Sequence, residues 1–282
     1  FLDLSMMYYW KEILNRRVLM KNMSRIGIGT AKLGNIIYGD SLTKRYKRLL
    51  LDAYDCGLTY FDTSNIYRNG WSEKIIGHAF HNNRDQVIIS TKVGKKKTLT
   101  SRIVNKIIKK PEKEMVLSKV IINDSVKSSL ENLRTNYIDI LYLHSPNIDT
   151  LQKNLIKEVF DSLRELGTVN FFGASCDTIK EVQHLASIDI GMSYFQISAV
   201  NYFDNRQRYL EIAEKFNVSY VINRIFNCNE SSSVTSCPLL ADKINLVLSE
   251  ECVVSSLVGV RKQEHLMELC SIISKENILH DI

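Results

Sequence analysis

Four residues with complementary chemistry follow consecutive apolar segments of this sequence. Asp62, Lys92 and His144 come directly after the segments 58–61, 87–91 and 138–143, and Tyr67 follows Asp62 by five residues. A tyrosine hydroxyl is a weak acid, but a neighbouring ammonium stabilises the phenolate and makes the hydroxyl a better proton donor. A carboxylate beside the lysine keeps that ammonium charged, and an imidazole can orient and donate to a carbonyl group. These residue types predict a general acid held over a carbonyl.

Such a set contains no nucleophile and no group of metal ligands, so the attacking species has to come from a cofactor. Hydride transfer is a reaction of this kind. Taken singly, each residue has an ordinary structural explanation: a capping carboxylate, a solvated lysine, a packed tyrosine or a core histidine. The prediction therefore depends on the four side chains meeting at one place.

The elements that must bring them together alternate regularly along the chain. Short apolar runs rich in β-branched and aromatic residues predict strands at 25–29, 58–61, 86–91, 138–143, 169–173, 194–197, 218–222 and 253–258. Segments with helical periodicity lie between and after them, at 42–56, 72–81, 123–133 (capped by Asn123 and Asp124), 151–166, 179–186, 206–216, 239–248 and 263–273.

This alternation indicates the α/β class with a parallel sheet covered by helices, because parallel strands need crossovers and bury both faces. Eight repeats favour closure into a single (β/α)8 TIM barrel, whose active site lies at the carboxyl ends of the strands. A doubly wound open sheet is the rival, but the first predicted strand leads into Gly27-Ile-Gly29-Thr30-Ala-Lys-Leu-Gly34, which lacks the G-x-G-x-x-G spacing.

The composition is that of a globular protein. The 282 residues are 45% hydrophobic and 24% charged, and three prolines and no Gly/Ser-rich stretch leave no evident linker. We expect residues 1–24 to form an N-terminal extension packed at the bottom of the barrel, and residues 25–282 to form the barrel itself.

The net charge of +6 favours anionic ligands but is too small for this length to indicate nucleic-acid binding. No apolar run reaches the roughly 18 residues of a membrane span, and residues 1–24 lack the features of a signal peptide. The six cysteines are widely spaced without a C-x-x-C pair, so neither a zinc site nor a dense disulfide framework is indicated. These features predict a cytoplasmic protein.

The motifs around the four residues resemble those of the aldo-keto reductases. They include Phe61-Asp62-Thr63-Ser-Asn-Ile-Tyr67, Ser90-Thr91-Lys92-Val-Gly94, and Tyr137-Ile-Asp139-Ile-Leu-Tyr-Leu-His144-Ser-Pro146. The resemblance covers residues 25 to about 273. It implies a (β/α)8 barrel that reduces a small aldehyde or ketone, with the catalytic tetrad Asp62, Tyr67, Lys92 and His144 and with Tyr67 as proton donor. We expect a monomer or a small homo-oligomer.

The same resemblance implies NADPH as cofactor, with NADH as the alternative, and no metal. Ser175 and Gln196 match residues that hold the nicotinamide carboxamide, Arg224 takes the place of an aromatic residue that stacks on the ring, and Arg261 meets the adenosine phosphate. Cys176, His265 and Leu269 depart from the family pattern. The expected cofactor contacts are Gly29, Thr30, Asp62, Ser175, Cys176, Gln196, Arg224, Gly259, Arg261 and His265.

Several alternatives stay open at this level. A catalytically weak barrel could use a bound nucleotide to sense redox state and regulate a partner, and a barrel lyase or isomerase would bind no nicotinamide. The basic stretch 92–110 is either a solvated lid or a cluster that steers an anionic substrate. Cys176 is either a small buried hydrophobe or a redox-sensitive thiol.

Overall fold

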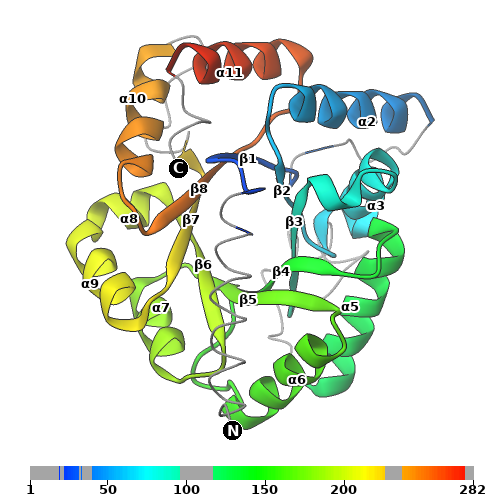
Figure 1. Cartoon of the computed structure of the whole chain (residues 1–282). Coiled ribbons are helices and arrows are strands. Elements are labelled where there is room, and N and C mark those ends of the chain that lie inside the picture. Colours follow the sequence, from blue (N-terminus) through cyan, green and yellow to red (C-terminus); the bar gives the residue numbers. More distant parts are fainter. Residues whose placement is uncertain are drawn as a thin grey trace, which may run out of the picture.

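A computed structural model describes residues 19, 22–31, 33, 40–95, 117–225 and 237–276. Within these residues, eight parallel strands pair in chain order, and β8 returns to pair with β1, so that the sheet is a closed barrel. Helices surround the strands (Figure 1). The predicted α/β class and (β/α)8 architecture are confirmed.

The strands are short, and most of their residues are buried because side chains fill the inside of the barrel and helices cover its outside. Their bounds are β1 (Ile26–Gly29), β2 (Tyr60–Asp62), β3 (Ile88–Val93), β4 (Ile138–His144), β5 (Val169–Ser175), β6 (Met192–Ser198), β7 (Ser219–Asn223) and β8 (Val253–Val258).

The outer helices are amphipathic, as α6 illustrates. Ile156, Val159, Phe160 and Leu163 recur at helical spacing and are buried, whereas most other α6 residues remain accessible. The described helices are α2 (Asp40–Asp55), α3 (Trp71–Phe80), α5 (Lys119–Leu133), α6 (Lys153–Glu165), α7 (Ile179–Ser187), α8 (Ala199–Asp204), α9 (Arg206–Phe216), α10 (Cys237–Leu248) and α11 (Gln263–Glu276).

The structure differs from the predicted helices in two places. The start expected at Asn123 and Asp124 is wrong, because α5 already begins at Lys119, where the Ser118 hydroxyl accepts a hydrogen bond from the Ile121 N–H at 3.3 Å. The short helix α8 was not predicted; Ser198 caps it by accepting from the Asn201 N–H at 3.3 Å. In both cases a single serine side chain satisfies a free N–H of the first turn.

The inside of the barrel is filled by large aromatic side chains set against glycines. Tyr60, Tyr142 and Tyr194 are fully buried in one cluster. A Cβ atom added at Gly173 would lie 2.0 Å from the Tyr194 carbonyl oxygen and 2.9 Å from the Tyr142 ring. The missing side chain on β5 therefore makes room for the Tyr142 ring of β4 and for the backbone of β6.

The same interior cluster includes Leu19 and Met23, which precede β1 in the chain and are 5% and 4% exposed. The Ser24 hydroxyl accepts from the Thr59 and Tyr60 N–H groups at 3.0 and 3.1 Å, next to the start of β2. Most of residues 1–24 lie outside the described residues, so the predicted extension stays a prediction.

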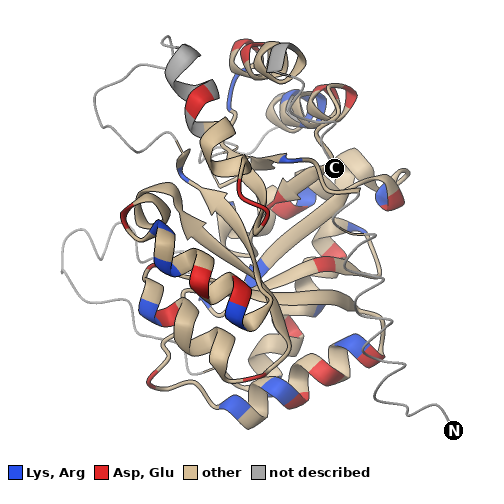
Figure 2. Cartoon of the chain, turned by 60° about the vertical axis from the view of Figure 1, so that its left-hand side comes forward, with Lys and Arg blue, Asp and Glu red and all other residues tan. Residues whose placement is uncertain are grey.

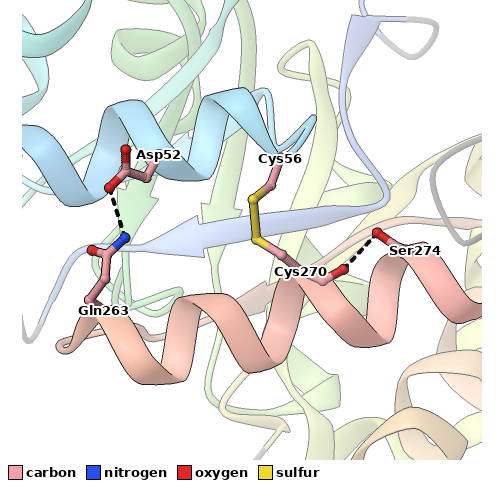
Figure 3. The surroundings of a disulfide bond; sticks show 5 residues. All are labelled: Asp52, Cys56, Gln263, Cys270 and Ser274. Carbon is pink, nitrogen blue, oxygen red and sulfur yellow. Dashed lines mark hydrogen bonds between the residues drawn. A yellow bond between two sulfur atoms is a disulfide. The ribbon is translucent and has the colours of Figure 1, made fainter.

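Helices α2 and α11 lie side by side outside the barrel (Figure 1). A disulfide joins Cys56, at the end of α2, to Cys270 in α11, with 6.0 Å between their Cα atoms (Figure 3). The Gln263 amide donates to the Asp52 carboxylate at 2.7 Å and links the same two helices. The wide spacing of the cysteines in sequence did not predict this pair.

Charges of both signs mix along the outer helices, and the strands are largely free of them (Figure 2). Among the helices that the structure describes, each is too short or too polar to cross a bilayer.

Candidate active site

Asp62, the last residue of β2, lies at the centre of a buried polar cluster. The Lys92 ammonium donates to its two carboxylate oxygens at 2.7 and 2.6 Å. Ser90 Oγ donates to Asp62 Oδ1 at 2.7 Å, and the Gln196 amide donates to the same oxygen at 2.9 Å. The whole residues Asp62 and Lys92 are 4% and 1% exposed. Each lone charge would be costly at this depth, but the ion pair and its neutral donors satisfy both.

Lys92 extends this cluster toward the mouth of the barrel. Its ammonium also donates to the Thr63 carbonyl at 2.8 Å. Burial acts to lower the pKa of Lys92, but the Asp62 carboxylate and Tyr67 act in the opposite direction, and the net pKa lies above its ordinary value. The side chain is therefore a permanent cation at neutral pH.

Tyr67 is placed over this cation by a tight turn between β2 and α3. The 3-10 turn Tyr67–Gly70 includes Arg68 and Asn69 with φ of 51° and 57°, and the Tyr67 N–H donates to the Ser64 carbonyl at 3.0 Å. The Lys92 nitrogen lies 5.2 Å from the centroid of the Tyr67 ring. The ammonium can thus stabilise negative charge on the phenol.

His144 ends β4, and its ring lies edge-on to the ring of Tyr67. The two ring centroids are 6.2 Å apart with the planes at 89°. Burial, followed by the cations Lys92, Lys95 and Arg224, lowers the pKa of His144 to about 2. His144 is therefore a neutral imidazole at physiological pH, able to donate one N–H but not to supply a proton as an imidazolium.

The structure thus brings Asp62, Tyr67, Lys92 and His144 together at the carboxyl ends of β2, β3 and β4. Two serines beside them were not predicted as site residues. Ser90 contacts Asp62, and Ser64 Oγ lies 3.4 Å from His144 Nδ1. For Ser90 the sequence did contain a signal. Ser90 precedes Lys92 by two residues, and residues two apart in a strand share one face, so its place beside the site could have been predicted.

The residues predicted to contact a cofactor divide into two groups. An accessible group surrounds the strand ends: Gly29, Ser175, Arg224, Gly259, Arg261 and His265. A buried group lies beneath: Thr30, Asp62, Cys176 and Gln196. The Thr30 hydroxyl is engaged within the protein, because it donates to the Asp62 carbonyl at 2.8 Å and accepts from Ser72 Oγ at 2.6 Å.

Cys176 and Leu269 mark two departures from the family pattern, and both side chains are buried, at 4% and 3% exposure. Burial, followed by the charges of Glu181 and Asp177, raises the pKa of the Cys176 thiol well above its ordinary value. A protonated, buried thiol is a packing group rather than a reactive one. The basic stretch beyond Lys95 lies outside the described residues.

This geometry defines a (β/α)8-barrel protein with a buried acid–lysine pair, a tyrosine and a neutral histidine at the end of the barrel where such folds carry their active sites. Residues 25–225 match the Aldo/keto reductase family, and the chain belongs to that family.

One relative in sequence is named as an oxidoreductase. The "Uncharacterized oxidoreductase YqkF" of Bacillus subtilis is 30% identical over 207 residues, which cover 71% of this chain and 60% of YqkF. The chain thus spans less than two thirds of the length of that relative.

Solved structures share the fold at lower identity. An aldo-keto reductase from Bacillus halodurans in its holo form has a TM-score of 0.75 and 19% identity, over 89% of this chain and 87% of that one. An aldo/keto reductase from Klebsiella pneumoniae in complex with NADP and acetate has a TM-score of 0.70 and 17% identity, over 89% and 86% of the two chains.

Proposed function

We propose that this chain reduces an aldehyde or a ketone with NADPH, and that Tyr67 protonates the carbonyl oxygen. The observation that carries the proposal is the buried Asp62–Lys92 ion pair beneath Tyr67, with its two hydrogen bonds of 2.7 and 2.6 Å. Membership of the Aldo/keto reductase family supports an oxidoreductase.

In this proposal each residue of the tetrad has one task. His144, being neutral, donates an N–H to the carbonyl oxygen and orients it. Tyr67 gives that oxygen its proton, and the Lys92 ammonium stabilises the phenolate left behind. Asp62 keeps Lys92 charged and fixed in place. The nicotinamide, when bound, supplies the hydride for the carbonyl carbon.

The accessible residues at the strand ends fit a dinucleotide phosphate. Among the described residues, a Cβ added at Gly259 would meet only the Gly29 carbonyl oxygen, at 3.9 Å, so the backbone there is open to a close approach. Arg261 is exposed just before α11, whose first N–H groups favour an anion. Ser175 would hold the carboxamide and Arg224 would support the ring. Gln196 lies in the buried group and its amide nitrogen already donates to Asp62, so only its side-chain oxygen would accept from the carboxamide.

Arg261 and Lys262 favour NADPH over NADH, because the extra phosphate of NADPH needs cations. The relative from Klebsiella pneumoniae was crystallised with NADP, which supports the same choice. NADH stays the alternative.

To test this proposal, the protein is mixed with NADPH and each of a panel of aromatic aldehydes, and the loss of NADPH absorbance is followed over time. We expect turnover by the parent protein and a loss of at least about 100-fold in kcat for Tyr67→Phe, which removes only the acidic hydroxyl. Tyr54→Phe is the matched control, because the Tyr54 hydroxyl donates to Gln86 at 2.6 Å on the outside of the barrel.

Equilibrium dialysis with NADPH completes the test. Tight binding without turnover on any carbonyl would contradict the proposal and favour a nucleotide-sensing regulator. Failure to bind any nicotinamide nucleotide would favour a lyase or an isomerase.

A further inference from the structure

A short chain of buried hydroxyl groups supports Asp62 from inside the barrel. Ser90 Oγ is 2.7 Å from Asp62 Oδ1, and the Tyr60 hydroxyl is 2.9 Å from Ser90 Oγ. Ser90 and Tyr60 are both fully buried. Tyr60 and Ser90 occupy β2 and β3, which are paired directly, so the backbone fixes this contact.

The chemistry of the groups sets the direction of both hydrogen bonds. An ionised carboxylate only accepts hydrogen bonds, so the Ser90 hydroxyl has to donate its single proton to the Asp62 carboxylate. The Ser90 oxygen then accepts from Tyr60. Burial and, after it, the charge of Asp62 raise the pKa of Tyr60, so Tyr60 keeps the proton that it donates. The two dipoles line up toward Asp62 and reinforce each other.

We propose that Ser90, supported by Tyr60, is a positioning residue that tunes the proton donor Tyr67 by way of Asp62 and Lys92. The inference rests on the proposed function and adds residues to it. The Ser90 hydroxyl points its positive end at Asp62 and offsets part of the carboxylate's charge. Lys92 is then less fully neutralised by Asp62 and stabilises a Tyr67 phenolate more strongly.

Other groups act on the same centre, and the experiment has to leave them unchanged. Lys92 from β3 and neutral His144 from β4 face Tyr67 directly. Lys95 and Arg224 act on His144 from the loops after β3 and β7. Gln196 from β6 contacts Asp62 itself. Tyr142 acts to lower the pKa of Tyr60, and Tyr194 acts to raise it.

The test compares the dependence of kcat on pH for the parent and for Ser90→Ala. Removing the hydroxyl makes the electrostatic potential at Tyr67 more negative, which disfavours the phenolate. We therefore expect the alkaline limb of the profile to shift to higher pH, by about 0.5 pH unit. A weaker acid at neutral pH should lower kcat about threefold. A merely structural role for Ser90 predicts lower kcat or stability with the limb unmoved, and this result would overturn the inference.

Two further variants separate the hydroxyl chain from a packing defect. Tyr60→Phe leaves the Ser90–Asp62 bond in place and removes the second dipole, so it should move the limb in the same direction by a smaller amount. Ser256→Ala is the control, because Ser256 is fully buried on β8 and its Oγ has no hydrogen-bond partner among the described residues. It should leave the limb in place.

A measurement without turnover keeps this inference distinct from the proposed function. In protein carrying ¹³Cζ-labelled tyrosine, the Tyr67 resonance is assigned from Tyr67→Phe and followed against pH by NMR. A higher titration midpoint in Ser90→Ala supports the inference even if no carbonyl is reduced, whereas an unchanged midpoint refutes it even if turnover is found.

Discussion

At the scale of single residues, the neutral state of His144 has a consequence for stability. Burial and the neighbouring cations lower the pKa of His144 to about 2 in the folded protein, from 6.5 in the reference state. Below pH 6.5 the His144 imidazole is protonated in the unfolded chain but stays neutral in the folded protein. The free energy of unfolding therefore falls as the pH drops from 6.5 toward 2.

We expect His144→Asn to remove this contribution. The difference in unfolding free energy between the parent and the variant should change by up to about 1.4 kcal/mol per pH unit between pH 6 and pH 4. Urea unfolding at several pH values measures it, and the carboxylates common to both proteins cancel in the difference. His184→Asn, at an exposed position of α7, is the control. A difference independent of pH would show that His144 is charged in the folded state.

At the scale of elements, the barrel depends on the close approach of Gly173 on β5 to the Tyr142 ring of β4 and to the backbone of β6. A methyl group at this position would lie 2.0 Å from the Tyr194 carbonyl oxygen, which belongs to the backbone and cannot move aside cheaply. We expect Gly173→Ala to lower the free energy of unfolding by about 3 kcal/mol, the upper part of the range for overpacked cores.

Urea unfolding again provides the measurement. Gly259→Ala is the comparison, since the nearest atom of the described part of the chain lies 3.9 Å from its added Cβ, and it should change stability far less. Equal effects of the two variants would mean that the clash on β5 is relieved by movement of the strands.

At the scale of the whole molecule, the Cys56–Cys270 disulfide ties the first described outer helix to the last. The two cysteines are 214 residues apart, so the cross-link restricts most of the unfolded chain. On the chain-entropy account, its reduction should lower the free energy of unfolding by about 5 kcal/mol.

Thermal unfolding with and without reductant tests this expectation, and the parent protein should melt at a lower temperature when reduced. The double variant Cys56→Ser with Cys270→Ser should melt near the reduced parent and should not respond to reductant. Equal melting temperatures of oxidised and reduced parent protein would contradict it.

The sequence by itself determined the barrel and the place of the tetrad. Alternating apolar runs and amphipathic segments are local patterns, and Asp62, Lys92 and His144 each stand at the end of such a run. Because parallel strands present their carboxyl ends at one edge, the order of the residues was enough to place these three at one mouth.

Only the tertiary structure decided what surrounds them. Gln196 is separated in sequence by 134 residues from Asp62, whose carboxylate accepts its hydrogen bond. The partners of Ser90 and Cys56 also come from other elements. A strand pattern shows which face a residue occupies, but the atoms opposite depend on the register and closure of the barrel. The Ser118 and Ser198 caps were missed for a different reason: serine starts a helix only where the backbone arrives in the right conformation.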